Sequence, residues 1–169
     1  MIESNTHDHA VKKLGQVIHD IQFAMLTTIE PDGSLRSRPM ATHQDFGKNF
    51  DGVLWFFTKF DTPKVGEVQH DKHVNLSYAS PEKNKYVSVS GMAILVRDPK
   101  KSEELWDPRY QAWFPKGLED PDLILLRVDV TKAEFWDAPS SNVAYPVDLV
   151  KGVNTGTTPD PGEHEKVSL

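Results

Sequence analysis

Residues 73–97 read HVNLSYASPEKNKYVSVSGMAILVR, and this stretch decides the expected fold. Residues 73–79 alternate between apolar and polar side chains, which is typical of a strand with one solvent-exposed face. A turn at 80–84 leads into a long strand over 86–97, so the pair is expected to run antiparallel. Gly91 lies in the middle of the second strand. An interior glycine there predicts a bend or a close backbone approach, which barrels need at their corners.

Further strands flank this pair on both sides. Apolar and β-branched runs bounded by turn residues predict strands at 23–29, 35–42, 53–58, 123–130 and 133–137. Helical spacing and cap-then-proline signals predict helices at 9–21, 63–71 and 99–106. Strands dominate and hairpin turns join most of them. The sequence therefore predicts a mainly β (α+β) fold, an antiparallel barrel with covering helices.

The length and composition fit one globular domain. The chain has 169 residues, of which 38% are hydrophobic and 26% charged. From residue 153 onward the sequence VNTGTTPDPGEHEKVSL shows neither periodicity nor apolar content. We therefore expect a single domain over residues 1–152 and a disordered tail over residues 153–169.

Charge and cysteine content exclude several classes of protein. The net charge is −6 and the pI is near 5.6, so nucleic acid and anionic membrane surfaces are not expected partners. The chain has no cysteine, which excludes disulfide scaffolds and thiolate zinc sites. Seven scattered histidines lack metal-site spacing, so no metal site is expected. No apolar stretch is long enough for a membrane span, and a cytoplasmic location is the expectation.

Thr62, Pro63 and Lys64 form a helix start that suits an anion. A threonine cap followed by proline predicts the first turn of a helix, whose free N–H groups favour negative charge. Lys64 adds a full positive charge there, and Thr58 at the end of the preceding strand can supply a hydroxyl. The plainer alternatives are a solvated lysine and an ordinary strand-end threonine.

Arg36 and Arg38 lie two apart on one strand, so they project from the same face. Such a pair suits one phosphate or carboxylate, although two strand arginines more often face solvent. Pro39 lacks a backbone N–H and belongs on an edge strand, where free backbone groups can bind a planar ligand. Aromatic residues that can wall a ring, or simply fill the core, are Trp55, Phe57, Trp113 and Trp136. The residues alone predict a small phosphorylated ligand.

Four segments in a fixed order carry a family resemblance. LRSRPMA, VLWFFTKFDTPKVGEV, HVNLSYASPEKNKYVSVSGMAILVRD and AEFWD resemble the pyridoxamine phosphate oxidase-like flavoproteins. Within that group the chain looks most like the general stress protein 26 family, over residues 11–139. The resemblance implies a split β-barrel and a homodimer that binds FMN, or FAD, between its subunits.

The resemblance also assigns roles to individual residues. It implies that Arg38 meets the flavin phosphate, that the backbone of the next three residues runs beside the ring, and that the 62–64 segment is the phosphate clamp. With Arg36 added from the strand argument, the expected flavin-binding residues are Arg36, Arg38, Pro39, Met40, Ala41, Phe57, Thr58, Thr62, Lys64 and Trp136. No catalytic residue is assigned.

Departures from the oxidase pattern limit the expected activity. His43 stands where the oxidases carry a lysine for the substrate phosphate, and residues 142–146 replace a late basic element. Pyridoxamine phosphate oxidation is therefore not expected. We expect an FMN-dependent oxidoreductase of unassigned substrate. The alternative is a non-catalytic flavin-binding stress or sensor protein. Relatives on the same barrel that bind haem or a deazaflavin give a third possibility, with His43 as the one histidine placed near the pocket.

Overall fold

The protein is described by a computed structural model that covers residues 2–43, 50–137 and 163–169. Its strands are β1 (Phe23–Ile29), β2 (Leu35–Ala41), β3 (Val53–Lys59), β4 (His73–Ser80), β5 (Lys85–Val96), β6 (Leu123–Asp137) and β7 (Glu163–Ser168). Its α-helices are α1 (Ile2–His19), α2 (Pro63–His70) and α3 (Pro99–Leu105), and its short 3-10 helices are η1 (Pro81–Lys83), η2 (Pro108–Ala112) and η3 (Gly117–Glu119). None of the helices in these ranges combines the length and apolarity needed to cross a bilayer.

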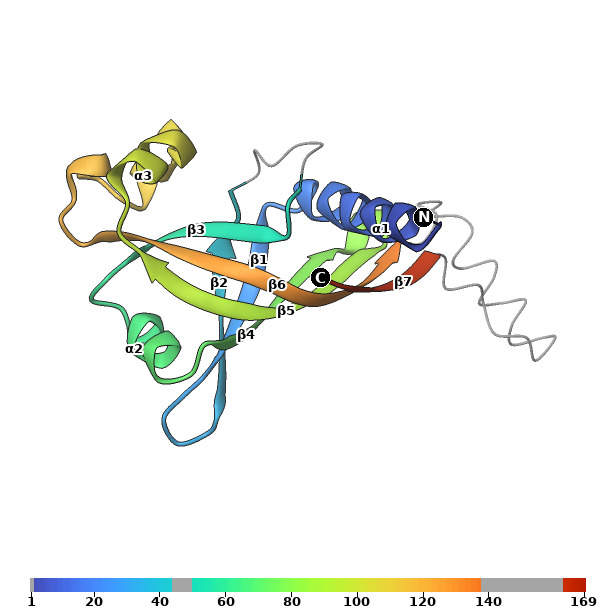
Figure 1. Ribbon diagram of the computed structural model, residues 1–169. Helices are drawn as coiled ribbons and strands as arrows, with labels where there is room; N and C mark the ends of the chain where they lie inside the picture. Colours follow the sequence, from blue (N-terminus) through green and yellow to red (C-terminus); the bar gives the residue numbers. More distant parts are fainter. Residues whose placement is uncertain (1, 44–49, 138–162) are drawn as a thin grey trace.

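The strands form one antiparallel sheet that curls on itself (Figure 1). The order is β2-β1-β4-β5-β6-β3, and β7 also pairs with β6. β3 and β7 lie end to end along one edge of β6, because β5 pairs along its other edge. β2 and β3 end the path and are not paired with each other, which leaves the barrel split between them. The predicted antiparallel split barrel with covering helices is confirmed.

Gly91 lies at an irregularity between the two longest strands. Ser90 pairs with Lys132 and Gly91 with Val130, so Thr131 is an extra residue on β6. The Thr131 hydroxyl donates to the Ser90 carbonyl at 3.1 Å. A Cβ at Gly91 would lie 2.5 Å from the carbonyl oxygen of Asp129. The predicted close backbone approach is confirmed, and it lies at a β-bulge.

The structure changes three sequence-based boundaries. β6 is one strand of 15 residues rather than two, because the bulge absorbs the break expected near residue 131. α1 begins at Ile2 rather than near His9 and ends at His19 rather than Ile21. The earlier start follows from a segment with neither glycine nor proline to interrupt a helix.

The prediction of a disordered tail is wrong for its last residues. Residues 163–168 form β7, which pairs with β6 from Lys132 to Asp137. Val167 is 4% exposed and belongs to the main core. The sequence of this segment gives no strand signal of its own. The segment forms a strand because the free edge of β6 offers backbone hydrogen-bond partners. The predicted domain boundary at 152 and the tail residues 153–162 lie outside the described residues.

The buried apolar residues form two clusters. The main core lies between α1 and the concave side of the sheet, with Leu14, Ile18, Leu76 and Phe135 fully buried. A second, smaller cluster joins the ends of β3 and β6 to α3 and the η2 segment. In Figure 1 α1 crosses the sheet near one end, while α2 and α3 lie toward the other. The second cluster and α2 border the split between β2 and β3.

Candidate functional site

A cavity of about 320 Å³ lies at the split between the edge strands β2 and β3. β2 contributes its last three residues, β3 its last three, and α2 its first turn. The lining is completed by aromatic residues from β1 and the η2 region. The described lining residues are Phe23, Pro39, Met40, Ala41, Phe57, Thr58, Lys59, Thr62, Lys64, Tyr110, Trp113 and Phe114. Seven of the ten predicted site residues therefore meet in one place.

Lys64 marks a cationic end of this cavity. Its Nζ donates to the Thr58 hydroxyl at 3.2 Å and to the Thr62 hydroxyl at 3.4 Å. No carboxylate among the described residues forms an ion pair with Lys64. Burial, followed by the positive charge of Arg38, lowers the pKa of Lys64 below its ordinary value. A lysine that is partly desolvated and held by neutral hydroxyls has the surroundings of an anion-binding group.

The helix start at this end is as predicted in position and different in detail. Thr62 occupies the N-cap and Pro63 the first helical position of α2. The Thr62 hydroxyl, however, donates to the Lys59 carbonyl at 2.8 Å and makes no capping bond to the helix. Pro63 has no N–H, and the Val65 N–H donates to the Thr62 carbonyl at 3.0 Å, so the Lys64 backbone N–H is the first-turn donor that is left for an anion.

Arg36 and Arg38 lie beside the cavity and are absent from its lining. They project from the same face of β2, as predicted, and both face Glu67 of α2. The Arg38 Nη2 lies 2.5 Å from the Glu67 Oε2, and the Arg36 Nη1 lies 3.6 Å from Oε1. The Thr28 hydroxyl donates to Glu67 at 2.5 Å. Burial opposes ionisation of Glu67, but the hydrogen bonds from Thr28 and Arg38 outweigh it and hold its pKa below the ordinary value.

The opposite end of the cavity is aromatic. Phe57 packs against Tyr110 with ring centroids 5.2 Å apart and against Phe114 at 6.3 Å. Trp113 meets Phe23 edge to face at 6.4 Å and is half exposed. Such a wall offers ring faces and edges to a planar ligand. Pro39, Met40 and Ala41 of the edge strand β2 line the same cavity.

Trp136 and Trp55 lie elsewhere in the subunit. Trp136 stacks on His164 of β7 at 5.2 Å with an interplanar angle of 7°. On β6, Leu125 pairs with Phe57 of the cavity lining. Trp136 lies eleven residues further along β6, which corresponds to about 35 Å of strand. Trp55 packs on the second cluster, between Lys101 and Arg127. Neither tryptophan is part of the described cavity lining.

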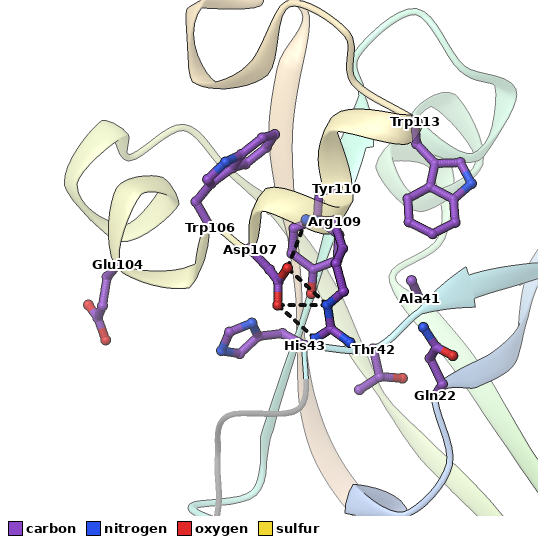
Figure 2. A pocket seen from close by; sticks show the side chains of 10 residues that line it. All are labelled: Gln22, Ala41, Thr42, His43, Glu104, Trp106, Asp107, Arg109, Tyr110 and Trp113. Carbon is purple, nitrogen blue, oxygen red and sulfur yellow. Dashed lines mark hydrogen bonds and ion pairs between the residues drawn. The ribbon is translucent and has the colours of Figure 1, made fainter.

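A second cavity of about 300 Å³ adjoins the first and shares Ala41, Tyr110 and Trp113 with it (Figure 2). Asp107 and Arg109 form a two-pronged ion pair in it, with N–O distances of 2.7 to 3.0 Å. The side-chain and backbone N–H groups of Arg109 lower the pKa of Asp107 to about 2. The other described residues that line it are Gln22, Thr42, His43, Glu104 and Trp106.

Some site residues were missed by the sequence argument. Tyr110 and Phe114 belong to an aromatic and proline-rich segment, and the lack of periodicity there gave no sign of which rings face the cavity. Phe23 begins a strand that reads as core, yet its side chain is 44% exposed beside Trp113. Glu67 lies three residues after Lys64 in the helix that bears the anion site. A carboxylate at that position was a signal for a charge partner.

The curled sheet, split at β2 and β3 with a cavity at the split, defines a split-barrel protein. The model of the pyridoxamine 5'-phosphate oxidase-like family matches residues 9–160, and the chain belongs to this family. A structure from Jannaschia sp., provisionally called general stress protein 26, aligns over 94% of this chain and 96% of that one, with TM-score 0.73 and 24% identity.

Two further relatives share more of the sequence. The general stress FMN/FAD binding protein of Xanthomonas citri is 30% identical, with TM-score 0.67, over 79% of this chain and 92% of that one. Protein bli-3 of Neurospora crassa is 28% identical over 158 residues, which cover 88% of this chain and 75% of that protein.

Proposed function

We propose that the cavity at the split holds FMN, with its phosphate at Lys64 and its ring along the aromatic wall. The observation that carries the proposal is the polarity of this one cavity. A partly desolvated lysine with two hydroxyls lies at one end, and aromatic rings with the backbone of an edge strand lie at the other. FMN has the same division into a phosphate and a flat ring. The Xanthomonas citri relative, described as an FMN/FAD binding protein, supports the same ligand class.

The phosphate fits the described residues. Lys64 supplies the charge, and the hydroxyls of Thr58 and Thr62 and the Lys64 backbone N–H supply further donors. Arg36 and Arg38 lie near enough to Lys64 to lower its pKa, but both are paired with Glu67. Met40 and Phe57 are almost fully buried, so the ring end can exclude water. FAD would need room for a second phosphate and an adenosine beyond Lys64, and FMN is the simpler occupant.

We further propose that the site is completed in a homodimer. Trp136 is one of the residues that family resemblance assigns to the flavin, yet it lies about 35 Å along β6 from the cavity of its own subunit. Because Trp136 lies so far along β6, we propose that it contributes to a neighbouring subunit's cavity instead. Phe23, which lines the cavity, and Met25 next to it on β1 are exposed apolar residues that suit such a contact.

When bound, FMN supplies hydride or single-electron transfer, and the protein supplies binding and orientation. No carboxylate or histidine belongs to the described lining of the first cavity. We therefore propose an oxidoreductase whose own residues hold the ring and exclude water, with no carboxylate or imidazole of the described lining as acid or base at the ring. The same lack of a carboxylate or imidazole favours the second candidate, a non-catalytic flavin-binding stress or sensor protein.

The second cavity is the proposed place of the co-substrate, because it shares a wall with the ring end of the first. Asp107 is paired with Arg109 inside this cavity, and Glu104 is paired with Lys101 outside its lining, so it suits a polar ligand without a large net charge. Replacing Arg109 with alanine is expected to raise the KM for the co-substrate and to leave FMN affinity unchanged. Loss of FMN binding in this variant would argue that both cavities form one flavin site.

The deciding experiment is a titration of the purified protein with FMN and with riboflavin, followed by flavin fluorescence. Saturation at one FMN per subunit, with weaker riboflavin binding, is expected. Anaerobic addition of NADH or NADPH to the loaded protein then separates the two candidates. Bleaching of the flavin absorbance supports the oxidoreductase, and an unchanged spectrum supports the binding protein. No FMN binding at tens of micromolar would refute both.

A further inference from the structure

Tyr110 belongs to the wall that the two cavities share. The described residues common to both linings are Ala41, Tyr110 and Trp113. Ala41 has no polar side-chain group, and the Trp113 indole donates a hydrogen bond without releasing its proton. The Tyr110 phenol is therefore the one group of this described wall that can both donate a hydrogen bond and transfer a proton.

The position of the Tyr110 ring is fixed by its neighbours. Its centroid lies 5.2 Å from that of Phe57 and 5.9 Å from that of Trp106. The Tyr110 backbone N–H donates to the Asp107 carbonyl at 2.9 Å, and its own carbonyl accepts from the Trp113 N–H at 3.0 Å. Because the side chain is already ordered, a ligand can bind to its hydroxyl without a further loss of side-chain entropy.

The Tyr110 hydroxyl is available to a ligand. None of the described residues forms a hydrogen bond with its Oη. Figure 2 shows the side chain beside the Asp107–Arg109 pair. Burial and the Asp107 carboxylate raise the pKa of Tyr110 above its ordinary value. The hydroxyl therefore keeps its proton throughout the neutral pH range.

The second cavity suits a flat, uncharged ligand that carries oxygen acceptors. Its volume is about 300 Å³, and the rings of Trp106 and Trp113 are part of its lining. The charges of Asp107 and Arg109 cancel in their ion pair, and the Gln22 amide offers a further hydrogen-bond donor. A quinone combines these properties, because it is planar and uncharged and has two carbonyl oxygens.

We propose that Tyr110 is a catalytic residue that donates a hydrogen bond, and then its proton, to a carbonyl oxygen of a quinone in the second cavity. The inference rests on the proposed FMN-dependent oxidoreductase. A quinone becomes a quinol by taking up two electrons and two protons. Two electrons and one proton come as a hydride, which is the chemistry that reduced FMN supplies. The hydride adds to one carbonyl oxygen, and the π electrons of the quinone shift to the other. That second oxygen takes its proton from the Tyr110 Oη, and the phenolate recovers a proton from water.

The first test is the binding of menadione, a quinone, to flavin-free protein, followed by quenching of tryptophan fluorescence. Tyr110→Phe keeps the ring that packs on Phe57 and removes only the hydroxyl. We expect menadione to bind about three- to ten-fold more weakly to this variant, as the loss of one hydrogen bond predicts. Methylnaphthalene, which has the same rings and no carbonyl, should bind equally to both proteins. The chain has no cysteine, so the quinone cannot add to a thiol.

Tyr86→Phe is the matched control variant. It removes a phenol hydroxyl from an exposed position outside both described linings, and its affinity for menadione should equal that of the unaltered protein. No menadione binding to the unaltered protein, or equal affinities in Tyr110→Phe, would overturn the inference.

The second test separates proton transfer from binding. FMN-loaded protein is reduced anaerobically by light and EDTA and then mixed with saturating menadione or with ferricyanide. Tyr110→Phe should slow reoxidation by menadione roughly 10- to 100-fold and abolish its solvent isotope effect. Reoxidation by ferricyanide, which takes single electrons and no proton, should stay within about two-fold. Equal rates with menadione in both proteins would overturn the inference.

Flavin titration keeps this result apart from the proposed function. Because phenylalanine preserves the aromatic wall, Tyr110→Phe should bind FMN and riboflavin within about two-fold of the unaltered protein. A large loss of both affinities would assign the hydroxyl to the flavin ring and overturn its role toward the quinone. The proposed function fails separately, by absence of FMN binding in the unaltered protein.

Discussion

Replacing Lys64 with alanine is the most direct test of the anion site. Lys64 is the one cation in the described lining that is held only by hydroxyls, since Lys59 pairs with Asp120 at 3.6 Å. A charge-assisted bond to phosphate is worth about 1.5–3 kcal/mol. At about 1.4 kcal/mol for each factor of ten, FMN affinity should fall roughly 10- to 150-fold. Riboflavin affinity should change little.

The same substitution makes a separate prediction about stability. Burial and the nearby Arg38 disfavour the charged form of Lys64, as its lowered pKa records. The free energy of unfolding without flavin should therefore change by less than about 1 kcal/mol. Flavin fluorescence titration and urea denaturation measure the two effects. Lys83→Ala, at an exposed lysine paired with Asp20, is the charge-matched control. Equal losses of FMN and riboflavin affinity, or no loss, would refute the assignment of Lys64 to the phosphate.

Three further predictions follow from the electrostatics and the sheet. FMN affinity should be constant below the lowered pKa of Lys64 and fall as pH rises through it, a decrease that Lys64→Arg should remove; titrations from about pH 7 to 10 measure it. Because the pKa of Glu67 is lowered, its contribution to stability is complete above its unfolded pKa and lost as pH falls through the folded one; urea unfolding at about pH 7 and pH 3 should show a smaller difference for Glu67→Gln. Gly91→Ala should cost about 1–3 kcal/mol of unfolding free energy because its Cβ meets the Asp129 carbonyl, whereas Gly66→Ala, in open space on α2, should be neutral or stabilising.

Local signals account for the features that the sequence predicted well. Alternation and turn residues located β1 to β5, and the threonine-proline-lysine start placed α2 beneath the end of β3. Thr58 and Lys64 met as expected because six residues and one tight turn separate them. Pro39 on an edge strand followed from its missing N–H, and β2 is indeed the end of the sheet.

The features that were missed depend on distant contacts. The partner of Arg38 is Glu67, which lies 29 residues away on another element. The strand pattern therefore indicated the positive charge of Arg38 but not the carboxylate that pairs with it. β7 has a single buried valine, which is too weak a pattern to predict a strand. It forms a strand because it pairs with the part of the β6 edge that β3 leaves free. Tyr110 lies in η2 and Phe114 just after it, and both rings pack on Phe57 without following a helical or strand period.

The shared edge of β6 has a practical consequence for handling the protein. β3 covers one half of that edge and β7 the other, so the last residues act as a built-in cover against intermolecular strand addition. A chain shortened before Glu163 would present an unpaired strand from Lys132 to Asp137 to every other molecule in solution. Clipping by proteases or a bulky fusion at this end should therefore appear first as concentration-dependent aggregation, and an affinity tag belongs at the other terminus.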